Sequence, residues 1–144
     1  MKSDVSKVII VVVIATLLLL VGLGIYIFFR KPIIFFEVIG CKSMVPVVYL
    51  NVRNPLIYFL LFCVPDALWY MSLLLLQTLF YSEKGRLSNL LRNCAMVLPF
   101  LLEVLQCFGI ILGTFDWYDI LTYCLTLILF LCLKKLFLPL YYKS

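Results

Sequence analysis

Histidine is absent from the 144-residue chain, and only 13% of its residues are charged. Without histidine, zinc sites with imidazole ligands and Ser-His or Cys-His catalysis are excluded. A soluble domain is about a quarter charged and about half apolar, whereas 66% of this chain is hydrophobic. A domain of about 150 residues leaves about 30% of its surface exposed, so one small core cannot hide this much apolar surface. The composition indicates an integral membrane protein whose partner is the lipid bilayer.

The six cysteines contain no C-x-x-C pair, so a zinc ribbon or a dithiol redox motif is not supported. Five of them lie inside apolar runs, where cysteine behaves as a small hydrophobic residue. No nucleophile motif, metal-ligand set or phosphate loop is found, and we predict no catalytic residue, metal or cofactor. The net charge of +5 comes from basic residues that flank apolar runs, which favours orientation in a bilayer over nucleic-acid binding.

Four apolar runs are long enough to cross a membrane, which takes about 20 helical residues. The first run, Val8 to Phe29, carries no charge and is too long for the core of a signal peptide. We therefore predict an all-α, polytopic membrane protein that forms a single domain, with four transmembrane helices at about residues 8–29, 56–81, 93–112 and 116–138.

The segment between the first two runs, residues 30–55, mixes charged residues with short apolar pieces and contains three prolines. Prolines argue against one long helix, and we predict a partly structured outer loop. Two short apolar pieces are expected to pair as a small hairpin or to lie at the membrane surface: Ile33 to Val38 and Val45 to Leu50.

Pro65 and Asp66 interrupt the second apolar run. A proline and an acid both suit the first turn of a helix. We predict a main helix from Asp66 to Tyr81 with a short helix from Leu56 to Val64 leading into it, and the alternative is one kinked span. Residues 82–92 are polar and predict a turn.

The distribution of lysine and arginine predicts the topology. With both termini in the cytoplasm, eight of the 12 basic residues lie on the cytoplasmic segments and four on the outer ones, as the positive-inside rule requires. We predict a multi-pass protein of the cell membrane with both termini cytoplasmic and with Cys41 and Thr114 outside.

Four of the seven acidic residues then gather near the outer face: Asp66, Glu103, Asp116 and Asp119. The three aspartates also have a simpler interpretation, because each lies at the start of a predicted helix. Thr114 or Asp116 can cap the fourth helix, and Asp119 follows Asp116 with the spacing of a capping box.

Glu103 has no capping role, because it lies in the middle of the third run. An ionisable group at that depth costs several kcal/mol unless it is paired or hydrated. Gln106 projects from the same face, and Pro99 kinks the helix nearby. These residues indicate a functional pocket or, alternatively, a structural hydrogen bond between helices. Trp69 and other aromatic residues at this level form a stacking wall for a ligand or an interfacial belt.

The stretch EVLQCFGIILGTFDWYDILTY, residues 103–123, resembles the last two helices of VanZ-like membrane proteins. That family carries E-x-x-Q, a short loop and an entry similar to G-T-F-D-W-x-D-x-L-x-Y, and the stretch from Pro65 to Trp69 is also similar. Thr126 replaces a frequent glycine, and an arginine often found in the loop is missing. The founding member is linked to low-level teicoplanin resistance, so the resemblance implies a class of envelope protein and no defined mechanism.

We hypothesise an envelope protein whose outer-facing acidic and aromatic pocket binds an unknown ligand or protein partner. We expect no binding to nucleic acid, and the protein can form oligomers. A small cation- or proton-coupled transporter and an intramembrane acid–base enzyme are the alternatives. The candidate ligand-binding residues are Asp66, Trp69, Glu103, Gln106, Asp116 and Asp119.

Overall fold

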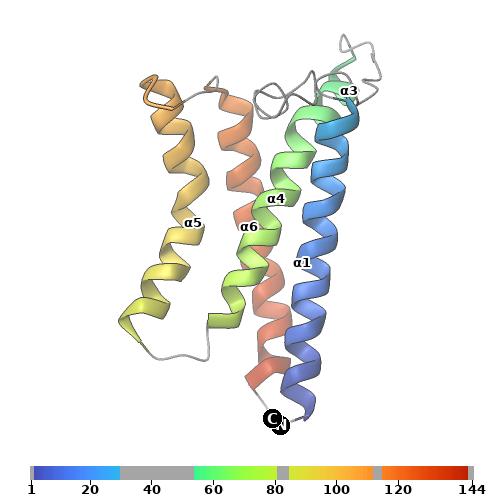
Figure 1. Ribbon diagram of the computed structural model, residues 1–144, viewed down its shortest axis with the longest axis vertical. Coiled ribbons are helices and arrows are strands. Elements are labelled where there is room, and N and C mark those ends of the chain that lie inside the picture. Colours follow the sequence, from blue (N-terminus) through green and yellow to red (C-terminus); the bar gives the residue numbers. More distant parts are fainter. Residues whose placement is uncertain (1, 30–53, 81–84, 112–114, 143–144) are drawn as a thin grey trace, which may run out of the picture.

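The computed structural model describes residues 2–29, 54–80, 85–111 and 115–142 (Figure 1). All secondary structure within these ranges is helical, which confirms the predicted all-α fold. The hairpin or surface segment predicted within residues 30–55 lies almost entirely outside the described residues, as do Cys41 and Thr114.

Four helical segments are long and apolar enough to cross a membrane, as expected of a multi-pass membrane protein. Their exposed surfaces are rich in leucine, isoleucine and valine, which lipid can cover. The four segments are Val8–Phe29, Pro55–Gln77, Arg86–Cys107 and Trp117–Lys134.

The first span is α1 (Lys2–Phe29), which runs beside α4 (Val64–Gln77). Ala15 of α1 is fully buried, and its carbonyl oxygen accepts a hydrogen bond of 2.8 Å from the hydroxyl of Ser72. A Cβ atom added at Gly22 would lie 3.2 Å from the carbonyl oxygen of Pro65. Small residues let two helix backbones approach closely, and this is how helices associate where lipid removes the hydrophobic driving force.

The second span is continuous, so the alternative of one span describes it better than two separate helices. It consists of α3 (Pro55–Tyr58), the π-helical turn η1 (Phe59–Cys63), α4 and the 3₁₀ turn η2 (Thr78–Phe80). The N–H of Val64 donates to the carbonyl oxygen of Phe59, five residues earlier. Pro65, which has no N–H to donate, is thereby accommodated in the first turn of α4 without a break in the helix.

The third span, α5 (Arg86–Cys107), begins within the segment predicted to be a polar turn. Leucine and arginine are good helix formers, and the side chains of Arg92 and Asn89 bond one turn apart. The helix ends before the predicted residue 112, because Gly109 adopts φ +66°. The N–H groups of Gly109 and Ile110 donate to the carbonyl oxygens of Gln106 and Leu105, at 2.9 Å each, which is a Schellman cap.

An aromatic layer fills the middle of the bundle, where α4 and α5 pack against α6 (Trp117–Tyr142). We define this layer as Tyr70, Phe100 and Tyr123. Their rings are nearly perpendicular to one another, with centroids 5.5 to 6.1 Å apart. The Tyr70 hydroxyl donates to the carbonyl oxygen of Met96 at 2.8 Å. Leu74 and Phe130 complete the buried core. This core ties three of the four spans together.

The contact between α1 and α4 predicts that substitutions at two glycines of α1 differ in their effect on stability. Gly22→Leu should destabilise the protein by about 1–3 kcal/mol, the usual cost of overpacking, because its side chain meets the backbone of α4. Gly24→Leu should be tolerated, because nothing lies within 4 Å of the added Cβ. Thermal unfolding of the two purified variants checks this, and an equal loss of Tm in both would contradict the packing described.

Candidate functional site

Three spans bring their acidic residues to the same end of the bundle. The chain enters α4 there, leaves α5 there and enters α6 there (Figure 1). We call this the acidic end, and it contains four of the predicted site residues: Asp66, Glu103, Asp116 and Asp119.

Glu103 is buried in α5, with only 4% of its surface exposed. Its Oε2 atom accepts a hydrogen bond from the backbone N–H of Asp116 at 3.4 Å. Asp116 directly precedes α6, so this contact joins the third span to the fourth. The contact corresponds to the alternative that the sequence left open for Glu103, a hydrogen bond between helices.

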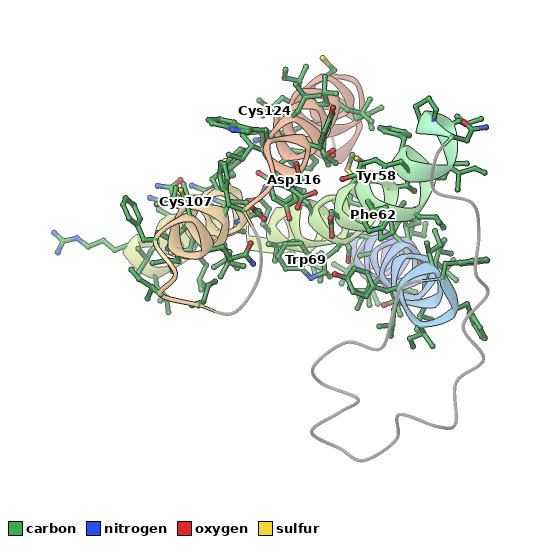
Figure 2. The ribbon with its side chains drawn as sticks, turned by 90° about the horizontal axis from the view of Figure 1, so that it is seen from above. Tyr58, Phe62, Trp69, Cys107, Asp116 and Cys124 are labelled. Carbon is green, nitrogen blue, oxygen red and sulfur yellow. The ribbon has the colours of Figure 1, made fainter. Side chains whose placement is uncertain are left out.

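Asp116 caps α6 and reaches a second segment with the same carboxylate. Its Oδ1 atom accepts from the N–H of Tyr118 at 2.9 Å, and its Oδ2 atom accepts from the hydroxyl of Tyr58 at 3.0 Å. The first bond is the N-cap predicted for this residue. The second bond connects Asp116 to α3, the first part of the second span. Figure 2 shows Tyr58 and Asp116 as neighbours where this span meets α6.

Tyr58 is a member of the site that the sequence did not reveal. Its ring stacks on Phe62, with centroids 4.7 Å apart, and meets the edge of Tyr118 at 5.9 Å. The π-helical turn η1 lies between Tyr58 and α4 and adds a residue to the turn. Such a turn changes the direction of every side chain before it, and π turns often occur at functional sites.

Asp66 and Asp119 complete the group around two buried side chains. The thiol of Cys63 shares a hydrogen bond with the hydroxyl of Thr122 and lies within electrostatic range of Asp66, Asp116 and Asp119. The hydroxyl of Tyr123 lies within electrostatic range of Asp66, Asp119 and Glu103. The four carboxylates therefore lie at the same end of the bundle, near the side chains of Cys63 and Tyr123.

Trp69 and Gln106 take less part in this arrangement. Trp69 is half-buried, packs against the core, and lies on the side of α4 away from α6 (Figure 2). Gln106 is half-buried, and its backbone carbonyl caps the end of α5. The structure thus joins Glu103 to Asp116 and Asp116 to Tyr58 by hydrogen bonds. Asp66 and Asp119 lie near the buried side chains of Cys63 and Tyr123.

Within the described ranges, the basic residues lie towards the opposite end of the bundle. The basic residues of the described ranges lie near the start of α1, the start of α5 and the second half of α6: Lys2, Lys7, Arg86, Arg92, Lys134 and Lys135. Within the described ranges, no three acidic or cysteine side chains lie close enough together to hold a metal ion. The acidic end therefore lies away from the parts of the helices that carry these basic residues.

Comparisons of the chain with protein-family models, with curated proteins and with solved structures find no match. The resemblance to VanZ-like proteins accordingly stays a prediction from the motif residues.

The bond between Tyr58 and Asp116 predicts unequal effects for two tyrosines. Tyr58→Phe should lower stability by about 1–2 kcal/mol, because it removes a hydrogen bond to a carboxylate. Tyr118→Phe is the matched control, since this side chain is 59% exposed and only its ring contacts Tyr58. Chemical or thermal unfolding in detergent measures both, and a larger loss for Tyr118→Phe would rule out the arrangement.

Proposed function

We propose that the chain is a multi-pass protein of the cell membrane whose acidic end faces outward and binds an envelope ligand or protein partner. One observation carries the proposal: the buried carboxylate of Glu103 meets Asp116, which in turn meets Tyr58. Three segments from different parts of the chain thus converge on one acidic site.

The geometry of Glu103 favours a binding role over a purely structural one. Its contact with the N–H of Asp116 measures 3.4 Å, which is longer than the usual N–H···O range of about 2.7–3.2 Å. A bond of this length leaves the Glu103 carboxylate with acceptor capacity for a further partner. Glu103 lies four residues before the end of α5 and not, as the sequence predicted, in the middle of the span. It is nevertheless buried, and buried acids in membrane spans commonly mark functional sites.

The chemistry of the site indicates the kind of ligand it suits. Ionised carboxylates only accept hydrogen bonds, and four carboxyl groups lie at this end. A ligand that presents ammonium or several N–H or O–H groups would match them, and the rings of Tyr58 and Phe62 offer an adjacent stacking surface.

We further propose that the chain is a VanZ-like protein. In support of this, the two parts of the motif, E-x-x-Q and the entry to the last helix, contact each other through Glu103 and Asp116. Residues that lie far apart in the motif but close together in space are expected to act as a unit. The proposal concerns the class of protein and assigns no resistance phenotype.

The proposed orientation predicts which positions an external reagent reaches. In a background without the native cysteines, Thr114→Cys should react with an impermeant maleimide in intact cells, whereas Gly85→Cys should react only after lysis. The positive-inside rule gives this result, because the basic residues around Gly85 favour the cytoplasm. The reverse pattern of labelling would overturn the proposed orientation.

The proposed site predicts that the charge of Glu103 is needed for binding. Thermal unfolding of the purified protein across amines, cations, lipids and cell-wall precursors should identify a stabilising compound. A ligand at 100 times its Kd adds about 2.7 kcal/mol. Glu103→Gln keeps the shape of the side chain and should abolish this shift while expression and membrane insertion stay unchanged.

Two further variants serve as controls for that experiment. Asp119→Asn should also weaken binding, although asparagine caps helices well and would preserve a purely structural cap. Asp4→Asn makes the same chemical change near the start of α1, at the other end of the bundle, and should retain the full shift. If all three variants bind like the natural protein, the acids are structural. Solute flux in liposomes that depends on Glu103 would favour the transporter instead.

A further inference from the structure

Gln77, the last residue of α4, is a buried polar side chain that the acidic site does not use. Only 3% of its surface is exposed, and within the described ranges neither its amide oxygen nor its amide nitrogen has a hydrogen-bond partner. A primary amide offers two donors and an acceptor oxygen with two lone pairs. Leaving such groups buried and unpaired costs free energy, so a group of this kind calls for a specific explanation.

The position of Gln77 in the bundle follows from the helix register. Gln77 lies on the same face of α4 as Tyr70 and Leu74, since residues at these spacings share a helix face. Tyr70 bonds to Met96 of α5, and α4 and α5 run in opposite directions. Moving two turns along α4 to Gln77 and two turns back along α5 reaches the level of Ser88, which is only 4% exposed.

The surroundings of Gln77 differ on its two sides. Towards the acidic end, the fully buried Leu74 and the aromatic layer close the bundle. In the other direction, α4 ends at Gln77 and only the short 3₁₀ turn η2 follows it in the second span. The shorter route from the amide to the outside of the bundle therefore leads to the end opposite the acidic site.

The amide also limits what that molecule can be. A cation would satisfy only its oxygen and an anion only its nitrogen, whereas water both donates and accepts. Buried waters typically make about three hydrogen bonds to protein groups, and the amide and the Ser88 hydroxyl supply such groups. We propose that Gln77 binds water that enters the bundle between α4 and α5 from the end opposite the acidic site.

Thiol chemistry tests this proposal, because methanethiosulfonates react with the thiolate, which forms where water is present. Gln77→Cys, Leu74→Cys and Leu76→Cys are compared in the full-length protein without its native cysteines, with 2-aminoethyl methanethiosulfonate as the probe. Leu74 lies in the core one turn earlier, and Leu76 is exposed on the surface of the span. Gln77→Cys should react at least about tenfold faster than both controls, and a rate equal to that of Leu74→Cys would overturn the proposal.

A stability measurement keeps the proposal falsifiable if the cysteine variant does not fold. Gln77→Met preserves the size of the side chain and removes its hydrogen-bonding groups. If the amide were dry and unpaired, this change would remove a desolvation cost and raise Tm. A hydrated amide loses its bonds to water instead, so we expect a Tm at or below that of the natural protein. A higher Tm would refute the water site.

Discussion

Asp116 takes part in hydrogen bonds to three segments of the acidic end. Its carboxylate caps α6 and accepts from Tyr58 of the second span, while its backbone N–H donates to Glu103 of the third span. The first N–H groups of a helix have no partners within the helix, and a hydrocarbon environment supplies none. In a capping box the acid at the third helical position accepts the N–H of the capping residue. Here Glu103, from another helix, accepts it.

The rest of the bundle depends on close packing and on a few polar contacts, because lipid is as apolar as the helix surfaces. On one side, Ala15 and Gly22 bring the backbone of α1 against α4. On the other side, the aromatic layer joins α4, α5 and α6. The bond from Tyr70 to Met96 lies beside Pro99, which interrupts the hydrogen-bond ladder of α5 because proline has no N–H.

The fold and part of the site could be predicted because they depend on local properties. Run length and charge indicate four spans, and an acid within an apolar run singled out Glu103. The boundaries of α5 were wrong for physical reasons: its polar first turns still form a helix, and the apolar run continues past the cap at Gly109. Tyr58 could not be found, because its direction depends on a π-helical turn that no sequence pattern announces. The direction of Trp69 depends likewise on which helices flank α4.

The partners of α1 have a consequence for the order in which the protein assembles during synthesis. Among the described elements, α1 packs chiefly against α4, and the bond from Ser72 to Ala15 and the contact at Gly22 lie within this pair. Membrane helices insert one by one and associate afterwards, so the first two spans can form a stable hairpin before the ribosome has made the rest. The acidic end needs residues from the last three spans. It is therefore completed only when α6 enters the membrane.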